Sequence, residues 1–315
     1  MAYSDKNKGI FSASIRANKQ IGRRFYRVTL EFLEAGAKAF ANCQPGQFAQ
    51  LDISRSALPA AEAIPKDLVD TAGRKILLRR PFSFSDVTVK GDKTFVDILY
   101  CVVGPASLRM TTLSAGDSIS VIGPLGNSFW VPKDKKNALL VAGGMGAGPL
   151  QHLAKVLTAD FPDIKVIAFA GAKTANELPF EARLDKISQQ LGFSLAEFAR
   201  YGVESLVATD DDSAGRPGLV TDCLTEWLGR TALACEDTII YGCGPEAMLA
   251  TLAEIGAERK IDCQVSMERM MACGIGLCQS CAVECKVEKA AETVYKLCCA
   301  DGPVFDAKEV VFRRS

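Results

Sequence analysis

The sequence predicts a β-barrel, an α/β domain with a parallel sheet and a small cysteine-rich domain, in this order along 315 residues. Three observations predict it. Short β-branched and aromatic runs separated by Gly, Asp and Lys fill residues 1–133, as in antiparallel barrels. Strand-like and helix-like segments alternate over residues 134–260, as in helix-covered parallel sheets. Residues 261–315 hold more than half of the 12 cysteines, which indicates a third unit.

The elements of the first two domains follow from these patterns. In the barrel we expect strands over 25–33, 46–53, 95–103 and 117–126, and a long loop with one helical turn over 55–75. In the α/β domain we expect strands over 137–144, 164–172, 204–212 and 237–245, alternating with helices over 148–161, 177–192, 218–230 and 246–260. Ligands of such sheets bind outside the carboxyl ends of the strands.

Composition excludes several classes of protein. The chain has 37 Lys and Arg against 37 Asp and Glu, so it offers no basic field to nucleic acid or to a membrane, and we expect neither as a partner. No apolar run approaches the ~20 residues that span a bilayer, and the N-terminus lacks a signal-peptide core. We therefore expect a cytoplasmic protein. Its thiols then indicate metal or redox chemistry, whereas the single histidine, His152, is expected to be structural.

The densest motif is MACGIGLCQSC, residues 271–281. Cys273, Cys278 and Cys281 have the C-x4-C-x2-C spacing of a loop that wraps a [2Fe-2S] cluster. Gly274 and Gly276 tolerate positive φ and so allow the loop to curl while its thiolates converge. A zinc site is the weaker alternative, because zinc knuckles use paired C-x2-C spacings and the second pair is missing here. Buried free thiols are a third interpretation.

The fourth cluster ligand has to come from elsewhere in the segment. Cys298 and Cys299 are the two leading candidates, and Cys263 is a less favoured one. Cys285 follows Cys281 closely within a strand-like run, so we expect it to be a buried thiol.

Two glycine-rich turns follow expected strands of the α/β domain. Gly143, Gly144 and Gly146 precede a helix, where backbone N–H groups bind phosphate and small residues let a pyrophosphate approach. The second turn, YGCGPEAM, follows the last strand. Its Cys243 lies where a nicotinamide ring would arrive, or else it is a small buried residue.

The type of dinucleotide depends on the residues near its ribose. Lys173 follows the second strand, and Asp210, Asp211 and Asp212 follow the third. Acidic side chains accept hydrogen bonds from ribose hydroxyls and repel a 2′-phosphate, which favours NAD over NADP. The alternative is that the aspartates form a solvated turn.

The run RRPFSFSDV, residues 79–87, lies in the β-rich half. Arg80 supplies a cation that can bind a diphosphate, Pro81 and Phe82 a rigid turn, and Ser83 a hydroxyl that can reach a flavin ring atom. Taken alone, the run is better explained as a surface arginine before a strand. The nicotinamide and cysteine motifs elsewhere in the chain favour the flavin interpretation.

These motifs, together with GPLGNSFW, occur in the order found in the ferredoxin–NADP reductase superfamily, which the chain resembles from about residue 10. The cysteine segment makes it similar, within that superfamily, to the electron-transfer subunits of type B, NAD-dependent dihydroorotate dehydrogenases. The resemblance implies an FAD-binding β-barrel over 1–133, an NAD-binding domain over 134–260 and a [2Fe-2S] domain over 261–315. The register of the ending CCADGP matches Cys299 to the fourth ligand.

The resemblance also implies the site and the partner. The partner is an FMN-containing catalytic subunit that oxidises dihydroorotate to orotate in pyrimidine biosynthesis, in a heterotetramer of two plus two. Electrons would pass from FMN through the cluster to FAD, and then as hydride to NAD. The residues carried over for the flavin and the dinucleotide are Arg80, Pro81, Phe82, Ser83, Ile98, Leu99, Tyr100, Ser107, Gly143, Gly144, Gly146, Gly244 and Pro245.

The sequence departs from the family and leaves other functions open. Pro105, Ala106 and Ser107 stand where the family has a Gly-Thr pair at the FAD phosphates. The same modules also serve NADH-dependent ferredoxin oxidoreductases, sulfhydrogenases and sulfite reductases. A non-catalytic redox sensor is the alternative from another class, and the complete flavin and nicotinamide motifs argue against it.

Overall fold

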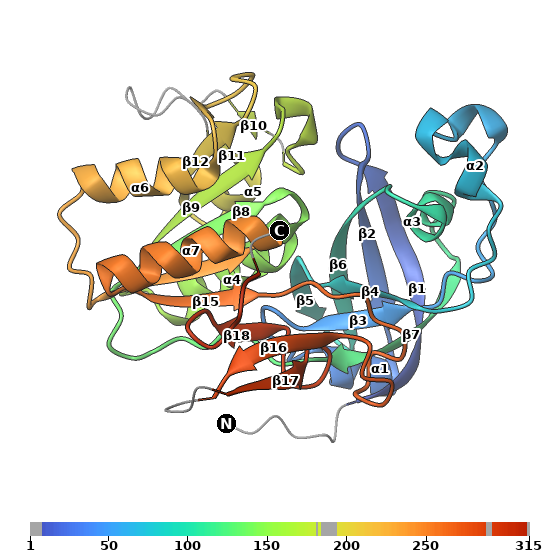
Figure 1. The fold of residues 1–315 in the computed structure, drawn as a ribbon. Helices are drawn as coiled ribbons and strands as arrows, with labels where there is room; N and C mark the ends of the chain where they lie inside the picture. Colours follow the sequence, from blue (N-terminus) through green and yellow to red (C-terminus); the bar gives the residue numbers. More distant parts are fainter. Residues whose placement is uncertain (1–7, 181, 184–193, 288–291, 314–315) are drawn as a thin grey trace.

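The structure is a computed structural model that describes residues 8–180, 182–183, 194–287 and 292–313. Two seven-stranded sheets lie beside one another, the first built from the N-terminal half and the second from the C-terminal half (Figure 1). The cysteine-rich segment lies where the two halves meet, next to strands of the first sheet (Figure 1).

The first sheet is antiparallel and curls back on itself. Its order is β4-β3-β7-β1-β2-β6-β5, and β4 also contacts β6. Side chains alternate between the two faces, so Leu30 and Val96, which pair across β2 and β6, are fully buried in the barrel core. The predicted β-barrel is therefore confirmed. The strands are β1 (Gly9–Gln20), β2 (Phe25–Phe32), β3 (Phe48–Leu51), β4 (Arg80–Ser83), β5 (Asp86–Lys90), β6 (Lys93–Cys101) and β7 (Ser118–Leu125).

Three short helices accompany the barrel. The sequence pattern missed α1 (Glu34–Phe40), which follows β2 directly and buries Phe40 against the barrel. Residues 55–75 contain 3-10 turns at Ala61–Ala63 and Lys66–Leu68 and the one-turn helix α2 (Val69–Ala72). This agrees with the expected long loop that holds one helical turn. This segment packs on α3 (Pro105–Met110) and is tied to the barrel by the ion pair between Arg24 and Asp67.

The second sheet is parallel apart from one edge strand. Its order is β13-β12-β9-β8-β14-β15-β18, and only β18 runs antiparallel to its neighbour. The central strand β8 is buried on both sides after its first residue, Asn137, which explains why the rest of its sequence is apolar. The strands are β8 (Asn137–Gly143), β9 (Lys165–Ala172), β12 (Glu204–Thr209), β13 (Arg216–Pro217), β14 (Thr238–Cys243), β15 (Asp262–Ser266) and β18 (Val304–Asp306).

Helices cover both faces of this sheet, as predicted. On β8, Leu140 packs with α4 (Ala147–Asp160), whereas Leu139 and Val141 face the opposite layer with α6 (Val220–Arg230) and α7 (Glu246–Arg259). The short helix α5 (Ala196–Ala199) joins the α4 side. The helix expected over 177–192 lies largely outside the described residues. A short 3-10 turn (Ala175–Glu177) and the paired strands β10 (Ala182–Arg183) and β11 (Ser194–Leu195) are the described parts nearby.

The C-terminal segment is continuous with the second sheet. β15 pairs with β14 and β18 pairs with β15, so both strands extend the parallel sheet beyond residue 260. Between them, β16 (Ala282–Lys286) and β17 (Thr293–Leu297) form a separate hairpin beside the cysteine loop. The boundaries at 133/134 and 260/261 therefore stay predictions. Among the described residues, no helix is both long and apolar enough to cross a membrane.

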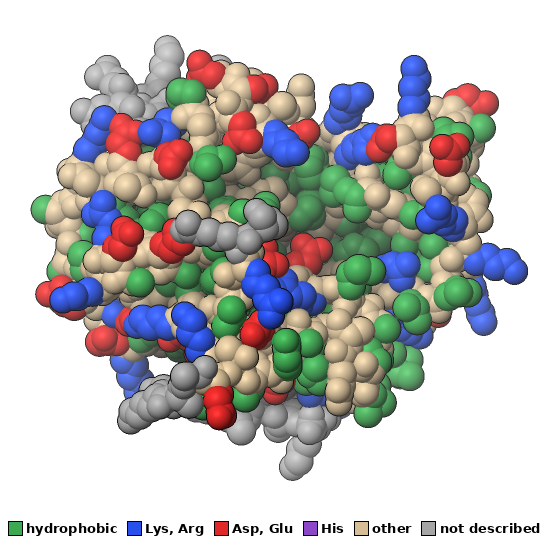
Figure 2. All heavy atoms as spheres, in the orientation of Figure 1, with side chains coloured by type: hydrophobic (Ala, Val, Ile, Leu, Met, Phe, Trp, Pro, Cys, Tyr) green, Lys and Arg blue, Asp and Glu red, His purple; other side chains and the backbone are tan. Residues whose placement is uncertain are grey.

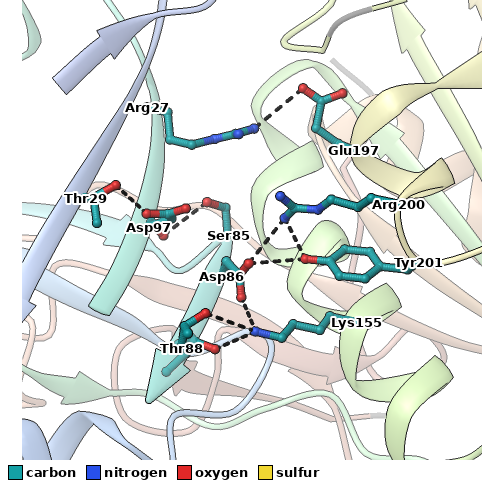
Figure 3. A network of polar contacts seen from close by, with 11 residues as sticks. Arg27, Thr29, Ser85, Asp86, Thr88, Asp97, Lys155, Glu197, Arg200 and Tyr201 are labelled. Carbon is teal, nitrogen blue, oxygen red and sulfur yellow. Dashed lines mark hydrogen bonds and ion pairs between the residues drawn. The ribbon is translucent and has the colours of Figure 1, made fainter. Parts of the chain in front are cut away.

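A polar network joins the barrel to the α4 side of the second sheet (Figure 3). Asp86, near the end of the run RRPFSFSDV, accepts hydrogen bonds from Lys155 of α4 and from Tyr201, the latter at 3.2 Å, and pairs with Arg200 at 3.3 Å. Lys155 also donates to a β5 carbonyl at 2.6 Å. Because carboxylate and cations come from different domains, the network fixes how the two sheets face one another.

Candidate cofactor-binding sites

The cysteine loop, residues 271–281, contains neither a helix nor a strand and curls around its own thiols. Gly274 and Gly276 have φ of +70° and +86°, as the sequence predicts for a loop that turns its backbone inward. Cys273 Sγ receives the N–H groups of Ile275 and Cys278, at 3.5 and 3.4 Å. Backbone donors of this kind stabilise a thiolate that binds iron.

The four candidate ligands are arranged as two pairs. Cys273 and Cys278 face one another at the exposed end of the loop, and Cys281 and Cys299 share a hydrogen bond at its buried end. Within the described part of the chain, no three His, Cys, Asp or Glu side chains are placed to hold one metal ion. A [2Fe-2S] cluster would be held by four thiolates, two for each iron. The residues present therefore fit a [2Fe-2S] cluster.

The neighbouring cysteines are oriented differently. Cys299 Sγ accepts the N–H of Gly276 at 3.2 Å and so faces the loop. Cys298 donates its thiol to the Met267 carbonyl at 3.2 Å, away from the loop, and burial raises the pKa of its thiol to about 12. Cys263 and Cys285 are buried in the apolar core.

The flavin-type run forms β4, which pairs with β3 in register Phe48 to Ser83 and Gln50 to Pro81. Phe82 packs edge-on against Tyr100, with ring centroids 6.4 Å apart. Arg80 is half-buried and donates to the Leu78 carbonyl at 2.7 Å, which orients its guanidinium along the strand. The neighbouring Arg79 is structural, because it bonds Ser120 and pairs with Asp52.

Strand β6 places its three candidate residues on two faces. Ile98 and Tyr100 point into the barrel core, where Tyr100 stacks on Tyr26 at 5.3 Å, so either could touch a cofactor only through its backbone. Leu99 points the other way, toward the start of α4. Ser107 uses its hydroxyl to accept the N–H of Val103 at 3.0 Å and of Gly104 at 3.2 Å, so it shapes the loop before α3.

The two glycine turns touch one another. A Cβ on Gly146 would lie 1.8 Å from the Cys243 carbonyl oxygen, and one on Gly143 would lie 2.6 Å from Pro245 Cδ. A Cβ on Gly244 would lie 2.9 Å from the Cα and N atoms of Gly143. Gly144, with φ of +51°, has open space on its Cβ side. The glycines therefore allow the two turns to pack closely against one another.

A cavity of about 980 Å³ opens between the barrel and the carboxyl ends of the parallel strands. Figure 2 shows a hollow between the two halves of the molecule, with hydrophobic side chains gathered in it. Gly143, Gly144 and Pro245 line the cavity on the sheet side, as do Lys173 and Asp210. A dinucleotide on such a sheet is expected at this edge.

Other predicted residues lie outside the cavity lining. Cys243 hydrogen-bonds Ser266, and burial raises the pKa of its thiol to about 12, so the thiol is neutral. Gly146 and Gly244 lie in the contact between the turns, and Arg80 and Ser83 lie on a strand that does not reach the cavity lining. His152 is buried on α4, and burial lowers its pKa to about 4, as befits a structural residue.

Sequence patterns missed the barrel side of this cavity. Arg23 and Arg24, in the turn between β1 and β2, and Cys101, at the end of β6, face the sheet across it. An adjacent arginine pair in a polar turn resembles any solvated surface, so only the fold reveals its position. On the sheet side, a hydrogen bond from Ser213 lowers the pKa of Asp211, which keeps this carboxylate charged.

The curled antiparallel sheet followed by a helix-covered parallel sheet is a fold that this chain shares with solved reductases. The solved structure titled as an NADH-dependent reduced ferredoxin-NADP oxidoreductase matches with a TM-score of 0.70, covering 95% of this chain and 90% of that one at 23% identity. The Amycolatopsis cytochrome P450 reductase GcoB matches with a TM-score of 0.58 over 81% of this chain and 67% of that one, also at 23% identity.

Sequence comparison identifies the family. The model of the iron-sulfur cluster binding domain of dihydroorotate dehydrogenase B matches residues 268–311, and the oxidoreductase NAD-binding domain matches residues 140–254. The electron transfer subunit of dihydroorotate dehydrogenase B (NAD(+)) from Caldanaerobacter subterraneus subsp. tengcongensis is 34% identical over 95% of this chain and 98% of its own. The subunit from Geobacillus kaustophilus is 35% identical over 95% and 97%. The chain belongs to this family of electron transfer subunits.

Proposed function

We propose that this chain is the electron transfer subunit of an NAD-dependent dihydroorotate dehydrogenase. It passes electrons from an FMN-containing, dihydroorotate-oxidising partner through [2Fe-2S] and FAD to NAD in pyrimidine biosynthesis. The observation that carries the proposal is the order of the three sites in space. The cysteine loop lies directly on β3, β3 pairs with the flavin-type strand β4, and the NAD-type turns face the same barrel across the cavity.

The ligand set follows from the orientation of the thiols. We assign Cys273, Cys278, Cys281 and Cys299 to the cluster. Two pairs suit two irons, and Cys299 faces the loop, whereas Cys298 is held by a carbonyl. The remaining thiols are buried in apolar surroundings or lie far along the chain from the loop.

Arg80 and Ser83 would hold FAD on β4, through its diphosphate and its ring, while Phe82 fixes the strand against Tyr100. Gly143 and Gly144 would offer backbone N–H groups to the NAD pyrophosphate. Asp210 would accept from a ribose hydroxyl and disfavour a 2′-phosphate. Cys243, half-buried and neutral, would shape the nicotinamide end rather than exchange a proton.

The order of cofactors follows from electron counting. When bound, the flavin accepts single electrons from the iron-sulfur side and delivers a pair as hydride to NAD. The chain's own residues keep the sites in place. The Asp86 network holds the barrel against α4, so that the strand β6 and the first glycine turn stay in contact (Figure 3).

The surface around the cluster loop suits a protein partner. Met270, Ile275 and Leu277 expose 90%, 49% and 77% of their surface next to ligands that require shielding from water. We propose that the FMN subunit covers them in a heterotetramer of two plus two. All twelve cysteines are free thiols, which supports a reducing compartment, and we propose the cytoplasm.

The test uses the chain purified without oxygen together with its bound partner. Dihydroorotate is added and the visible spectrum is recorded. Bleaching of flavin and cluster bands, reversed by NAD, is the expected result. If dihydroorotate leaves the spectrum unchanged while NADH bleaches it, the electron-transfer module stands but the dihydroorotate partner is wrong. The ferredoxin oxidoreductase, sulfhydrogenase and sulfite reductase interpretations then come back into consideration.

A further inference from the structure

Gln50, on β3, is fully buried, yet neither atom of its side-chain amide has a hydrogen-bond partner in the structure. A buried amide without partners is costly, and such cases are rare in folded proteins. Gln47, in the loop just before β3, shows that a buried glutamine in this region can find partners. Gln47 is equally buried, but its amide donates to the Gly126 carbonyl at 3.0 Å and accepts from Gln44 at 2.9 Å. A buried glutamine three residues away thus finds partners, whereas Gln50 does not.

That position is under the cysteine loop. Ala49 and Leu51 point into the barrel core, so Gln50 points outward, on the same face as Phe48, which packs with Cys281 and Cys299 in the other core. A Cβ on Gly274 would lie 2.3 Å from Gln50 Nε2. Gly274 directly follows the ligand Cys273, and its lack of a side chain is what lets the loop lie on this amide.

The same face also carries Pro81 and Ser83 of the flavin-type run. Gln50 pairs with Pro81, so Ser83 is its diagonal neighbour on β4, at roughly 7–8 Å. Gln50 thus lies between the strand proposed to hold FAD and the loop proposed to hold the cluster. An apolar side chain would fill this space without leaving two polar atoms unpaired, so the amide indicates a polar group that it meets there.

We propose that Gln50 is a positioning residue whose side-chain N–H donates to a sulfur of the [2Fe-2S] site and sets its reduction potential. Thiolate and sulfide are acceptors, and the reduced site carries one more negative charge than the oxidised one. A donor therefore favours reduction, and hydrogen bonds to the sulfurs are a known determinant of such potentials. The inference rests on the proposed function, because it requires the cluster to be present.

The test measures the midpoint potentials of cluster and flavin separately, by titration of the holoprotein monitored by EPR and by visible absorption. Gln50→Met keeps the shape and removes the donor. We expect the equilibrium constant for one-electron reduction of the cluster to fall about tenfold, so that its midpoint potential becomes ~59 mV more negative, while the flavin potential stays unchanged. Gln50→Asn keeps a polar amide but shortens it by one methylene. It is expected to shift the cluster in the same direction, and it decides the question if the methionine variant does not fold.

Gln151 provides a matched control. It is also buried with an unpartnered amide, but it lies on α4 in the second domain. Gln151→Met is expected to leave the cluster potential unchanged. An unchanged cluster potential in both Gln50 variants at equal iron content, or a shift of the flavin potential instead, would overturn the inference and leave the proposed function intact. Absence of iron from the wild-type chain would overturn both.

Discussion

Replacing Gly146 with alanine tests whether the two glycine turns must touch for NAD to bind. The added Cβ would lie 1.8 Å from the carbonyl oxygen and 2.2 Å from the carbonyl carbon of Cys243, and 2.8 Å from the nitrogen of Gly244. All three are backbone atoms, so no rotamer change relieves the clash. Since real contacts of this kind exceed 3.0 Å, one turn has to move by more than 1 Å.

Overpacking of this kind costs about 1–3 kcal/mol, and we expect the upper end because only backbone can yield. A loss of ~3 kcal/mol lowers the melting temperature by roughly 6–12 °C. If about half of this free energy is also lost from NADH binding, because the displaced turns no longer fit the dinucleotide, the Kd for NADH rises about tenfold. Thermal unfolding and an anaerobic titration of flavin absorbance with NADH measure both effects.

Gly148 supplies the control for the same substitution. It lies at the start of α4, and a Cβ there would meet Leu99 and Ser85 at 3.7 Å, an ordinary contact. Gly148→Ala is expected to bind NADH normally and to gain up to about 1 kcal/mol from helix propensity. If Gly146→Ala has the melting temperature and the Kd for NADH of the wild type, the two turns do not depend on a glycine at position 146 for their contact, and the reasoning fails.

Three further predictions address the ligands, the fold and the dinucleotide. Cys299→Ser is expected to lose iron while retaining FAD, and Cys298→Ser to retain both; measured iron and flavin contents that are equal in the two variants would contradict the assignment. Hydrogen bonds, chiefly the one from Lys135, lower the pKa of Asp262 in the folded protein. The ion pair therefore stabilises the fold at pH values above the pKa of Asp262 in the unfolded chain, and this stabilisation is lost as the pH falls through the pKa of Asp262 in the folded protein. Asp262→Asn should therefore lower stability at pH 7 by at most about 1 kcal/mol, because half of the carboxylate is exposed, and urea titrations of variant and wild type should converge in acid. Asp210→Asn is expected to raise the use of NADPH relative to NADH by about tenfold, and unchanged kcat/KM ratios would exclude a role in ribose selection.

The sequence predicted most of the fold because its periodicities are local. The β-branched and aromatic run at 25–33 and the apolar run at 138–143 follow from how strands are buried, and both became strands of the expected sheets. The helix α1 was missed, because its seven residues follow a strand without a capping side chain. The expected helix over 177–192 is wrong in its described part, where Ala175–Glu177 form a 3-10 turn and Ala182–Arg183 a short strand, and its remainder lies outside the described residues.

The candidate site shows a similar division. Spacing identified Cys273, Cys278 and Cys281, because one loop must bring three thiols to one cluster, and positive φ at the two loop glycines agrees with that prediction. Spacing could not distinguish Cys298 from Cys299. These neighbours differ only in which way their thiols point, toward a carbonyl or toward the loop, and β17 and the turn after it decide that.

By itself, the sequence determined the two sheets, the cysteine loop and the two glycine turns, since each is a property of a short contiguous stretch. Only the tertiary structure brought Arg23 and Cys101 to the cavity, joined β15 and β18 to the second sheet, and laid Gly274 on Gln50. These contacts join residues far apart in the chain, and no local pattern encodes them. They arise because burial of both sheets leaves one arrangement in which the barrel, the parallel strands and the loop share their faces.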